Sequence, residues 1–279
     1  MLDAARTPAP PMHFDDLRYD KHDGIARIAF DRPARLNALG DGSTRELVAA
    51  CEDAAADAAV RVVVITGGGE AFCAGGDFED TFARGRDKSA DQWSERIRRG
   101  PNALVRVLQG MAKPVLASVN GVAAGGGATI ALACDLRIAS ERASFSFPFA
   151  RLGLTPEFGC SHLLPRTVGL GRAMELLMLA EPLAAADAAR IGLVHSVVAH
   201  GALETATAAL ATRLRDMPGG ALGAIKSLLL RGQSLGIDAA LELEAQSLGR
   251  AFTSTEHRRA VDAFLARRAA RREGGARPN

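Results

Sequence analysis

The sequence predicts an α/β fold with a largely parallel sheet, followed by a C-terminal region of helices. Up to about residue 155, short runs of β-branched apolar residues alternate with segments of helical periodicity, as in strands joined by crossover helices. After that point, Ala- and Leu-rich helical segments dominate. In addition, glycine clusters at 67–69 and 125–127 follow two of the apolar runs, which indicates tight turns at strand ends.

Composition and charge limit what such a fold can do. The chain has 279 residues, of which 48% are hydrophobic, so a sizeable core can form. Its net charge is +2 with both signs abundant, which gives no reason to expect nucleic acid or a membrane as a partner. We divide the chain into a flexible N-terminal tail (1–13), a core (14–200), a C-terminal helical region (201–266) and a basic tail (267–279).

The cysteines and histidines do not indicate a disulfide framework or a metal site. The four cysteines are far apart without a CxxC pair, and the six histidines are scattered without an HExxH pattern. The N-terminus lacks the basic start and apolar stretch of a signal peptide, and no apolar run reaches the roughly 18 residues of a membrane span. We therefore expect a cytoplasmic protein without a metal.

Local sequence signals predict each helix and strand of the first half. Ser43 and Thr44 are candidate caps of a helix, with Glu46 as its capping-box acid. A second helical stretch can break at the pair Gly100 and Pro101. Alternating or continuous β-branched runs bounded by turn residues predict the strands. The predicted helices are 43–57 and 91–112, and the predicted strands are 24–33, 61–69, 113–121, 134–140 and 143–149.

The second half is expected to be helical. Its long apolar faces either pack within the chain or make subunit contacts, and the pattern leaves both open. The basic tail is either a solvated, frayed end or a phosphate contact. The predicted helices are 156–168, 170–180, 184–191, 202–215, 221–231, 237–252 and 255–270.

Two glycine-rich turns are candidate binding elements, GGGEAFCAGGDF at 67–78 and NGVAAGGGATIALACD at 120–135. In open α/β sheets, ligands bind outside the carboxyl ends of the strands, and glycine leaves backbone N–H groups uncovered there. Neither turn matches a nucleotide-binding pattern, so a phosphate cradle for ATP or NAD is not predicted. Each can be a plain tight turn, but together they could aim one N–H each at a single oxygen, as an oxyanion hole.

Five segments, met in order along the chain, carry a resemblance to a known family. They are RPARLNAL (32–39), VVITGGGEAFCAGGDF (63–78), KPVLASVNGVAAGGGATIALACDLRIAS (113–140), FARLGLTPEFGCSHLLPRTVGLGRAMELLM (149–178) and ARIGLVHSVV (189–198). From about residue 14 to about residue 265, the chain resembles the enoyl-CoA hydratase/isomerase (crotonase) family.

This resemblance implies a fold, a substrate and an assembly. The fold is a crotonase-like spiral of ββα units with a C-terminal helical trimerisation region, in homotrimers or hexamers. The substrate is an acyl-CoA, so that coenzyme A enters as part of the substrate and no further cofactor is implied. By motif position, the N–H groups of Gly76 and Gly126 would hold the thioester oxygen and stabilise an enolate.

The resemblance also implies where coenzyme A would lie. Arg35 is a candidate phosphate partner or, alternatively, a solvated surface residue. Asp77 also has the pattern of a cap for the next helix. The residues that would contribute backbone and shape around the adenine and pantetheine are Ala38, Ala74, Asp77 and Phe78.

The reaction depends on which acids are present. Hydratases of the family use two glutamates, and the matching positions hold Thr129 and Phe149, which supply neither acid nor base. A third reaction position holds Glu157, as in the branch that shifts an enoyl-CoA double bond from position 3 to position 2. The resemblance therefore implies an isomerase with Glu157 as its acid/base, and with Phe149 and Phe158 as an apolar wall that raises its pKa.

Other interpretations remain for this acid and for the whole chain. After Thr155 and Pro156, Glu157 can also be a first-turn acid of the helix 156–168, a position that lowers a carboxyl pKa. The alternatives for the chain are an enoyl-CoA hydratase or another enolate reaction of this fold, and a non-catalytic acyl-CoA-binding or RNA-binding homologue.

Overall fold

The strands form two sheets in a computed structural model that describes residues 12–40 and 42–274. The larger sheet has the order β1-β2-β3-β5-β7-β10 and is parallel except between β1 and β2. The smaller has the order β4-β6-β8-β9 and is parallel except between β8 and β9. The strands are β1 (Leu17–His22), β2 (Ile25–Phe30), β3 (Val62–Gly67), β4 (Ala71–Cys73), β5 (Val115–Val119), β6 (Val122–Ala124), β7 (Leu136–Ser140), β8 (Ser144–Ser146), β9 (Leu183–Ala184) and β10 (Ser196–Val198).

The helices follow a repeating pattern of two strands and a helical segment. β3 and β4 precede α2 and α3, β5 and β6 precede α4, and β7 and β8 precede α5. In each repeat the first strand joins the larger sheet and the second joins the smaller. The predicted α/β fold of ββα units is thereby confirmed. The helices are α1 (Ser43–Ala56), α2 (Ala90–Arg99), α3 (Pro101–Gly110), α4 (Gly126–Ala133), α5 (Cys160–Val168), α6 (Leu170–Leu179), α7 (Ala185–Arg190), α8 (Leu203–Arg215), α9 (Gly219–Gly232), α10 (Ile237–Thr253) and α11 (Thr255–Gly274).

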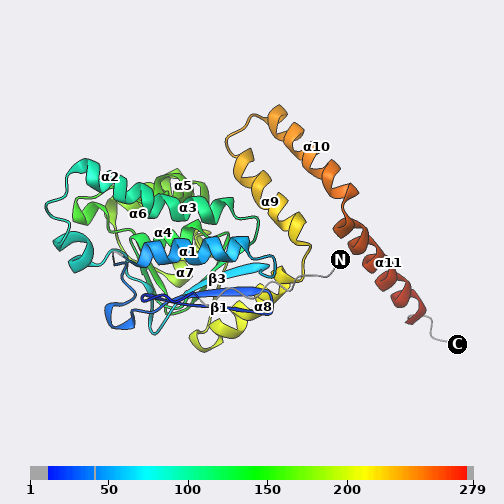
Figure 1. The fold of residues 1–279 in the computed structure, drawn as a ribbon, viewed down its shortest axis with the longest axis horizontal. Helices are drawn as coiled ribbons and strands as arrows, with labels where there is room; N and C mark the ends of the chain where they lie inside the picture. Colours follow the sequence, from blue (N-terminus) through cyan, green and yellow to red (C-terminus); the bar gives the residue numbers. More distant parts are fainter. Residues whose placement is uncertain (1–11, 41, 275–279) are drawn as a thin grey trace, which may run out of the picture.

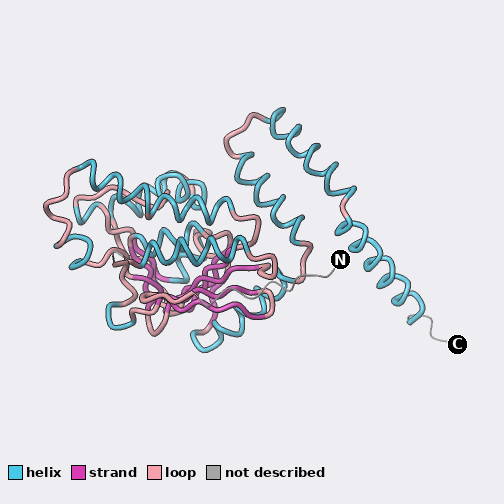
Figure 2. Tube along the Cα trace, viewed as in Figure 1, coloured by secondary structure: helices cyan, strands magenta, loops and turns pink. Residues whose placement is uncertain are grey.

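The strands lie between two groups of helices (Figures 1 and 2). The main core includes the buried faces of α1, α3 and α4 against the strands, and all eight residues of α4 are buried. α8 covers the other face of the larger sheet, where Leu203 and Ala211 pack with Val62, Val64 and Leu116. The glycine-rich turns therefore lie next to strands and helices that are packed in the core.

Two buried asparagines hold the connection between β3 and β4. The side-chain amide of Asn37 donates to the carbonyl oxygens of Gly68 (2.9 Å) and Ala71 (2.7 Å). The amide of Asn120 donates to those of Gly69 (2.9 Å) and Ala71 (3.1 Å). Because buried carbonyl groups need partners, these bonds fix the path of the first glycine-rich turn.

The last three helices extend away from the sheets as an arm, defined as residues 219–274 (Figure 1). Lys226 attaches α9 to the core, because its ammonium donates to the carboxylate of Asp135 (2.8 Å) and to the carbonyl oxygen of Leu108 (2.6 Å). Farther out, α10 has no buried residue. The exposed large apolar side chains of the arm are Ile225, Leu229, Leu235, Ile237, Leu241, Leu248, Phe252, Val261, Phe264 and Leu265.

Most predicted elements are confirmed to within a few residues, including the break between α2 and α3 at Gly100 and Pro101. β1 was not predicted, because charged residues interrupt its apolar alternation, and its pairing with β2 makes it a strand. The predicted capping box of α1 is wrong. Gly42 is the N-cap, and the Glu46 carboxylate instead accepts the N–H groups of residues 15 and 16.

α11 continues to residue 274, so the first part of the basic tail is helical, and residues 267–269 are exposed. Residues 275–279 of the basic tail lie outside the described residues, as do residues 1–11 of the predicted flexible tail.

Candidate active site

The two glycine-rich turns meet, as the sequence predicted. β4 and β6, which lie within these two segments, are neighbours in the smaller sheet, paired at Ala71–Val122 and Cys73–Ala123. A Cβ placed on Gly75 would lie 3.4 Å from the backbone nitrogen of Gly126. The backbone conformation at Gly75, with φ +88°, is one that other residues rarely adopt. The two turns thus form one continuous surface.

The N–H groups of Gly76 and Gly126 are suited to bind an oxygen. In the described part of the chain, neither N–H donates to a backbone acceptor in the turns, loops and caps. Gly126 is the first residue of α4, so its N–H belongs to the positive end of that helix. A Cβ at Gly127 would overlap the carbonyl oxygen of Cys73, which explains why glycine is needed where α4 packs against β4. The role of the two N–H groups as an oxyanion hole stays a prediction.

Glu157 lies beside this surface. One carboxylate oxygen, Oε1, is 3.3 Å from the position that a Cβ on Gly126 would take. Burial raises the pKa of the Glu157 carboxyl above its usual range, although the positive charge of Arg96 lowers it. Burial therefore outweighs the effects that favour the charged form. A carboxyl with a raised pKa beside free N–H groups can exchange a proton with a ligand held there.

The interpretation of Glu157 as a first-turn acid is wrong. α5 begins at Cys160 with Gly159 as its N-cap, and no acidic residue lies in its first turn. The backbone instead takes left-handed conformations at Phe158 (φ +51°) and Gly159 (φ +72°), which separate Glu157 from the helix. Left-handed backbone at a bulky residue is uncommon and clusters at functional sites.

Apolar side chains lie at the same point beside Gly126 that the Glu157 carboxylate approaches. Phe158 is 2% exposed, and its ring atom Cε2 lies 2.9 Å from the Cβ position of Gly126. Leu39 contributes its Cδ1 at 3.2 Å from the same position. Phe149 is also buried, at the start of the turn 150–152. The apolar atoms of Phe158 and Leu39 beside Gly126 contribute to the poor solvation of Glu157. The role of Phe149 in the apolar wall stays a prediction.

Thr129, which the resemblance places at the position of a hydratase acid, has a structural role in α4. Thr129 is fully buried in α4, and its hydroxyl donates to the carbonyl oxygen of Gly125 at 3.1 Å. The nearby thiols are also inert, because burial raises the pKa of Cys73 to about 12 and that of Cys160 to about 11. They are therefore neutral near pH 7 and are poor proton carriers there.

The two segments predicted to line coenzyme A lie side by side. The N–H of Ala74 donates to the carbonyl oxygen of Leu36 (3.0 Å), and the N–H of Leu39 donates to that of Gly75 (2.7 Å). Ala38 lies within the first of these segments, and its carbonyl oxygen accepts a bond from Arg32 Nη1 (2.7 Å). The two segments border the glycine surface on one side.

Asp77 and Arg35 are bound to protein groups. The Asp77 carboxylate caps the π-helical turn Phe78–Ala83, accepting the N–H groups of Glu79 (3.0 Å) and Asp80 (3.2 Å). Its pKa is lowered, because hydrogen bonds from the Asp80 N–H and from Arg35 outweigh the effect of burial. Arg35 Nη2 also pairs with Glu79 (2.8 Å). Phe78 is 65% exposed at the border of the site.

Arg96 was not identified from the sequence. It lies on α2, where its guanidinium is 5.4 Å from the ring centroid of Trp93, and its Nη2 donates to the hydroxyl of Thr81 at 3.4 Å. Its charge acts on Glu157. The spacing of Trp93 and Arg96 by three residues on a predicted helix was the available signal, since such residues face the same side.

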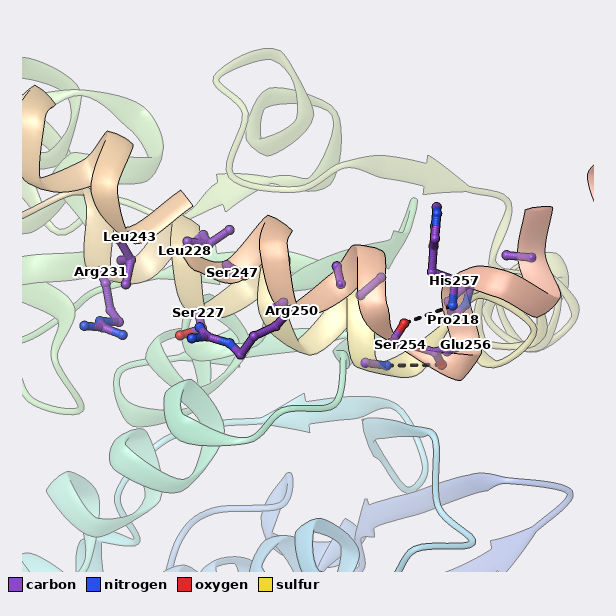
Figure 3. Close-up of a pocket in the computed structure, with 15 residues that line it drawn as sticks. Pro218, Ser227, Leu228, Arg231, Leu243, Ser247, Arg250, Ser254, Glu256 and His257 are labelled. Carbon is purple, nitrogen blue, oxygen red and sulfur yellow. Dashed lines mark hydrogen bonds between the residues drawn. The ribbon is translucent and has the colours of Figure 1, made fainter. Parts of the chain in front are cut away.

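A cavity of about 430 Å³ lies elsewhere, in the arm (Figure 3). It is formed between α9, α10 and α11, and Gly220 N–H donates to the Glu256 carboxylate at its edge (3.3 Å). None of the predicted site residues lines it. Within residues 12–40 and 42–274, no cluster of His, Cys, Asp and Glu side chains could hold a metal, and no helix is long and apolar enough to cross a membrane.

Comparisons with known proteins cover nearly the whole chain. A family model described as enoyl-CoA hydratase/isomerase matches residues 20–274. The 1,2-epoxyphenylacetyl-CoA isomerase of Escherichia coli K12 is 37% identical over 88% of this chain and 93% of that protein. The short-chain-enoyl-CoA hydratase of Clostridium acetobutylicum is 34% identical over 92% and 97%. The crystal structure of an enoyl-CoA hydratase from Polaromonas sp. JS666 superposes with a TM-score of 0.85 at 29% identity, covering 90% and 97%.

Proposed function

The chain belongs to the enoyl-CoA hydratase/isomerase family, and from this premise we propose that it is an isomerase that moves the double bond of a 3-enoyl-CoA to position 2. One observation carries the proposal. The Glu157 carboxylate lies beside Gly126, while Thr129 and Phe149 occupy the positions of the two hydratase acids. A single carboxylate with a raised pKa suits a reaction that takes up and returns one proton.

The reaction needs no group beyond those in the site. Glu157 takes the proton from C2, and the electron pair of that C–H bond moves toward the thioester to give a dienolate. The N–H groups of Gly76 and Gly126 stabilise its oxygen. Glu157 then returns the proton to C4, the C2–C3 double bond forms, and the thioester carbonyl is restored. Each N–H donor of this kind is typically worth about 10²–10³-fold in rate.

The test is turnover of a 3-enoyl-CoA by the wild type and by Glu157→Gln. We expect kcat to fall by about 10²–10⁴-fold, the range for loss of a general acid/base, with a small change in KM. Glu175→Gln, at an exposed glutamate of α6, is the matched control and should keep full activity. Near-wild-type activity of Glu157→Gln would sink the assignment.

A hydratase is the second candidate, because the relative from Clostridium acetobutylicum is named as one. Water addition to crotonyl-CoA at a rate independent of Glu157 would favour it over the isomerase. Failure to turn over any acyl-CoA, with retained binding of coenzyme A, would instead favour a non-catalytic acyl-CoA-binding homologue.

We further propose that coenzyme A lies along the paired segments 35–39 and 74–78. A CoA phosphate would replace the exposed Glu79 as a partner of Arg35, while Asp77 keeps its capping role. The exposed apolar side chains of the arm support a homotrimer or hexamer in which other copies cover them. The four buried, unpaired cysteines suit a reducing cytoplasm.

A further inference from the structure

Two arginines share the carboxylate of Asp77 beside the first glycine turn. We propose that one of them, Arg32, is a positioning residue for ligand binding: it holds and balances Asp77, which in turn orients Arg35 toward a phosphate. The inference rests on the proposed placement of coenzyme A along residues 35–39 and 74–78.

The Arg32 side chain joins the two segments that border the site, 35–39 and 74–78. It is 18% exposed, and its Nη1 donates to the carbonyl oxygen of Ala38 at 2.7 Å. Its Nη2 lies 3.1 Å from Oδ2 of Asp77. Because a planar guanidinium donates in fixed directions, Arg32 holds the second segment in place relative to the first.

The Asp77 carboxylate passes this placement on to Arg35. The Asp77 side chain is 4% exposed, and a buried carboxylate is stable only when partners compensate its charge. Arg35 Nη1 donates to both of its oxygens, Oδ1 at 3.2 Å and Oδ2 at 3.1 Å. Charge-assisted bonds to both oxygens hold the Arg35 guanidinium close against Asp77, so its orientation depends on that carboxylate.

The other side of the Arg35 guanidinium is accessible to a ligand. The Arg35 side chain is 47% exposed, and its Nη2 pairs with Glu79, which is 72% exposed (2.8 Å). An ion pair between exposed side chains contributes little to stability and is screened by salt. A phosphate can therefore take the place of Glu79 at Nη2, while Nη1 stays on Asp77.

Arg32 also balances the charge of this network. The carboxylates that pair with Arg32 are those of Asp16 (3.3 Å), Asp77 (3.1 Å) and Asp80 (3.2 Å). Asp80 has a second cation in Arg84 (2.9 Å). In the described part of the chain, the cations that pair with Asp77 are Arg32 and Arg35. Although three acids share Arg32, its loss would leave Arg35 to compensate Asp77, and less of the Arg35 charge would remain for a phosphate.

The experiment measures the Kd of coenzyme A by calorimetry, which does not depend on turnover. We expect Arg32→Gln and Arg35→Gln each to weaken binding by about tenfold, within the usual range of coupling between two groups. The double variant should bind within about threefold of Arg35→Gln, because Arg32 acts through Arg35. Arg84→Gln, which removes an exposed arginine from the same network, is the matched control and should bind like the wild type.

A second comparison separates positioning from a structural role. Asp77→Asn keeps a capping side chain but removes its charge, so adding Arg32→Gln to it should change the Kd by less than about threefold. This pair of variants leaves no unpaired charge at residue 77, so it can be measured even if Arg32→Gln alone does not fold.

Three outcomes would overturn the proposal. They are wild-type affinity in Arg32→Gln, a full additional loss when Arg32→Gln is added to Arg35→Gln, and a loss that persists when it is added to Asp77→Asn. The last two would mean that Arg32 contacts the ligand or only supports the fold. Wild-type affinity in Arg35→Gln would instead overturn the proposed placement of coenzyme A, whatever the Arg32 variants show.

Discussion

Helices α4 and α10 differ in how far their own chain buries them. Every one of the eight residues of α4 is buried by its own chain, whereas none of the residues of α10 is buried. α4 lies against β6 and α5, while the main neighbours of α10 are α9 and α11 of the same arm. α4 is therefore covered within its own chain, whereas the arm keeps large apolar side chains exposed, which supports the proposal that other copies of the chain cover them.

The largest expected effect is on assembly. Arginine at both Leu241 and Leu248, which are exposed and lie on one face of α10, should prevent other copies from covering the arm. We expect the mass from light scattering to fall from that of a trimer or hexamer to that of one chain, 29.2 kDa. Methionine at the same two positions is the control and should keep the assembly. A wild type that is already monomeric would contradict the proposal.

The next effect compares one glycine from each helix. Gly127→Ala should destabilise the protein by about 3 kcal/mol, because the added Cβ would overlap the Cys73 carbonyl of the adjacent strand. Gly249→Ala in α10 meets no atom within 4 Å and should stabilise by about 0.5–1 kcal/mol through helix propensity. Urea unfolding midpoints measure both. A destabilising Gly249→Ala would reveal a close neighbour on the arm.

The smallest effect concerns Glu157 and pH. Because its pKa is higher in the folded chain than in the unfolded chain, the folded state holds the proton more tightly, and stability is lost as pH rises from about 4 through the folded pKa. Glu157→Gln should therefore be more stable than the wild type at pH 8, by on the order of 1 kcal/mol. The difference should vanish near pH 4, as measured by urea unfolding at both pH values. A variant less stable than the wild type at pH 8 would argue against burial as the dominant influence.

Much of the fold was predictable because it depends on local patterns. The β-branched runs become buried strands, and the break between α2 and α3 falls at Gly100 and Pro101. The resemblance selected Gly76, Gly126 and Glu157, and the chain brings the two glycine turns and this acid together. The start of α5 was not predictable, because the left-handed turn at Phe158 involves a residue type that rarely adopts it.

The sequence by itself determined the alternation of strands and helices, the two glycine turns and the single acid at a family reaction position. These follow from periodicity and from residue chemistry over short spans. Only the tertiary structure decided that Glu157 is buried and lies outside the first turn of α5, so that its pKa is raised and not lowered. The physical reason is that solvation and charge depend on which distant segments are packed together, and no local pattern encodes that.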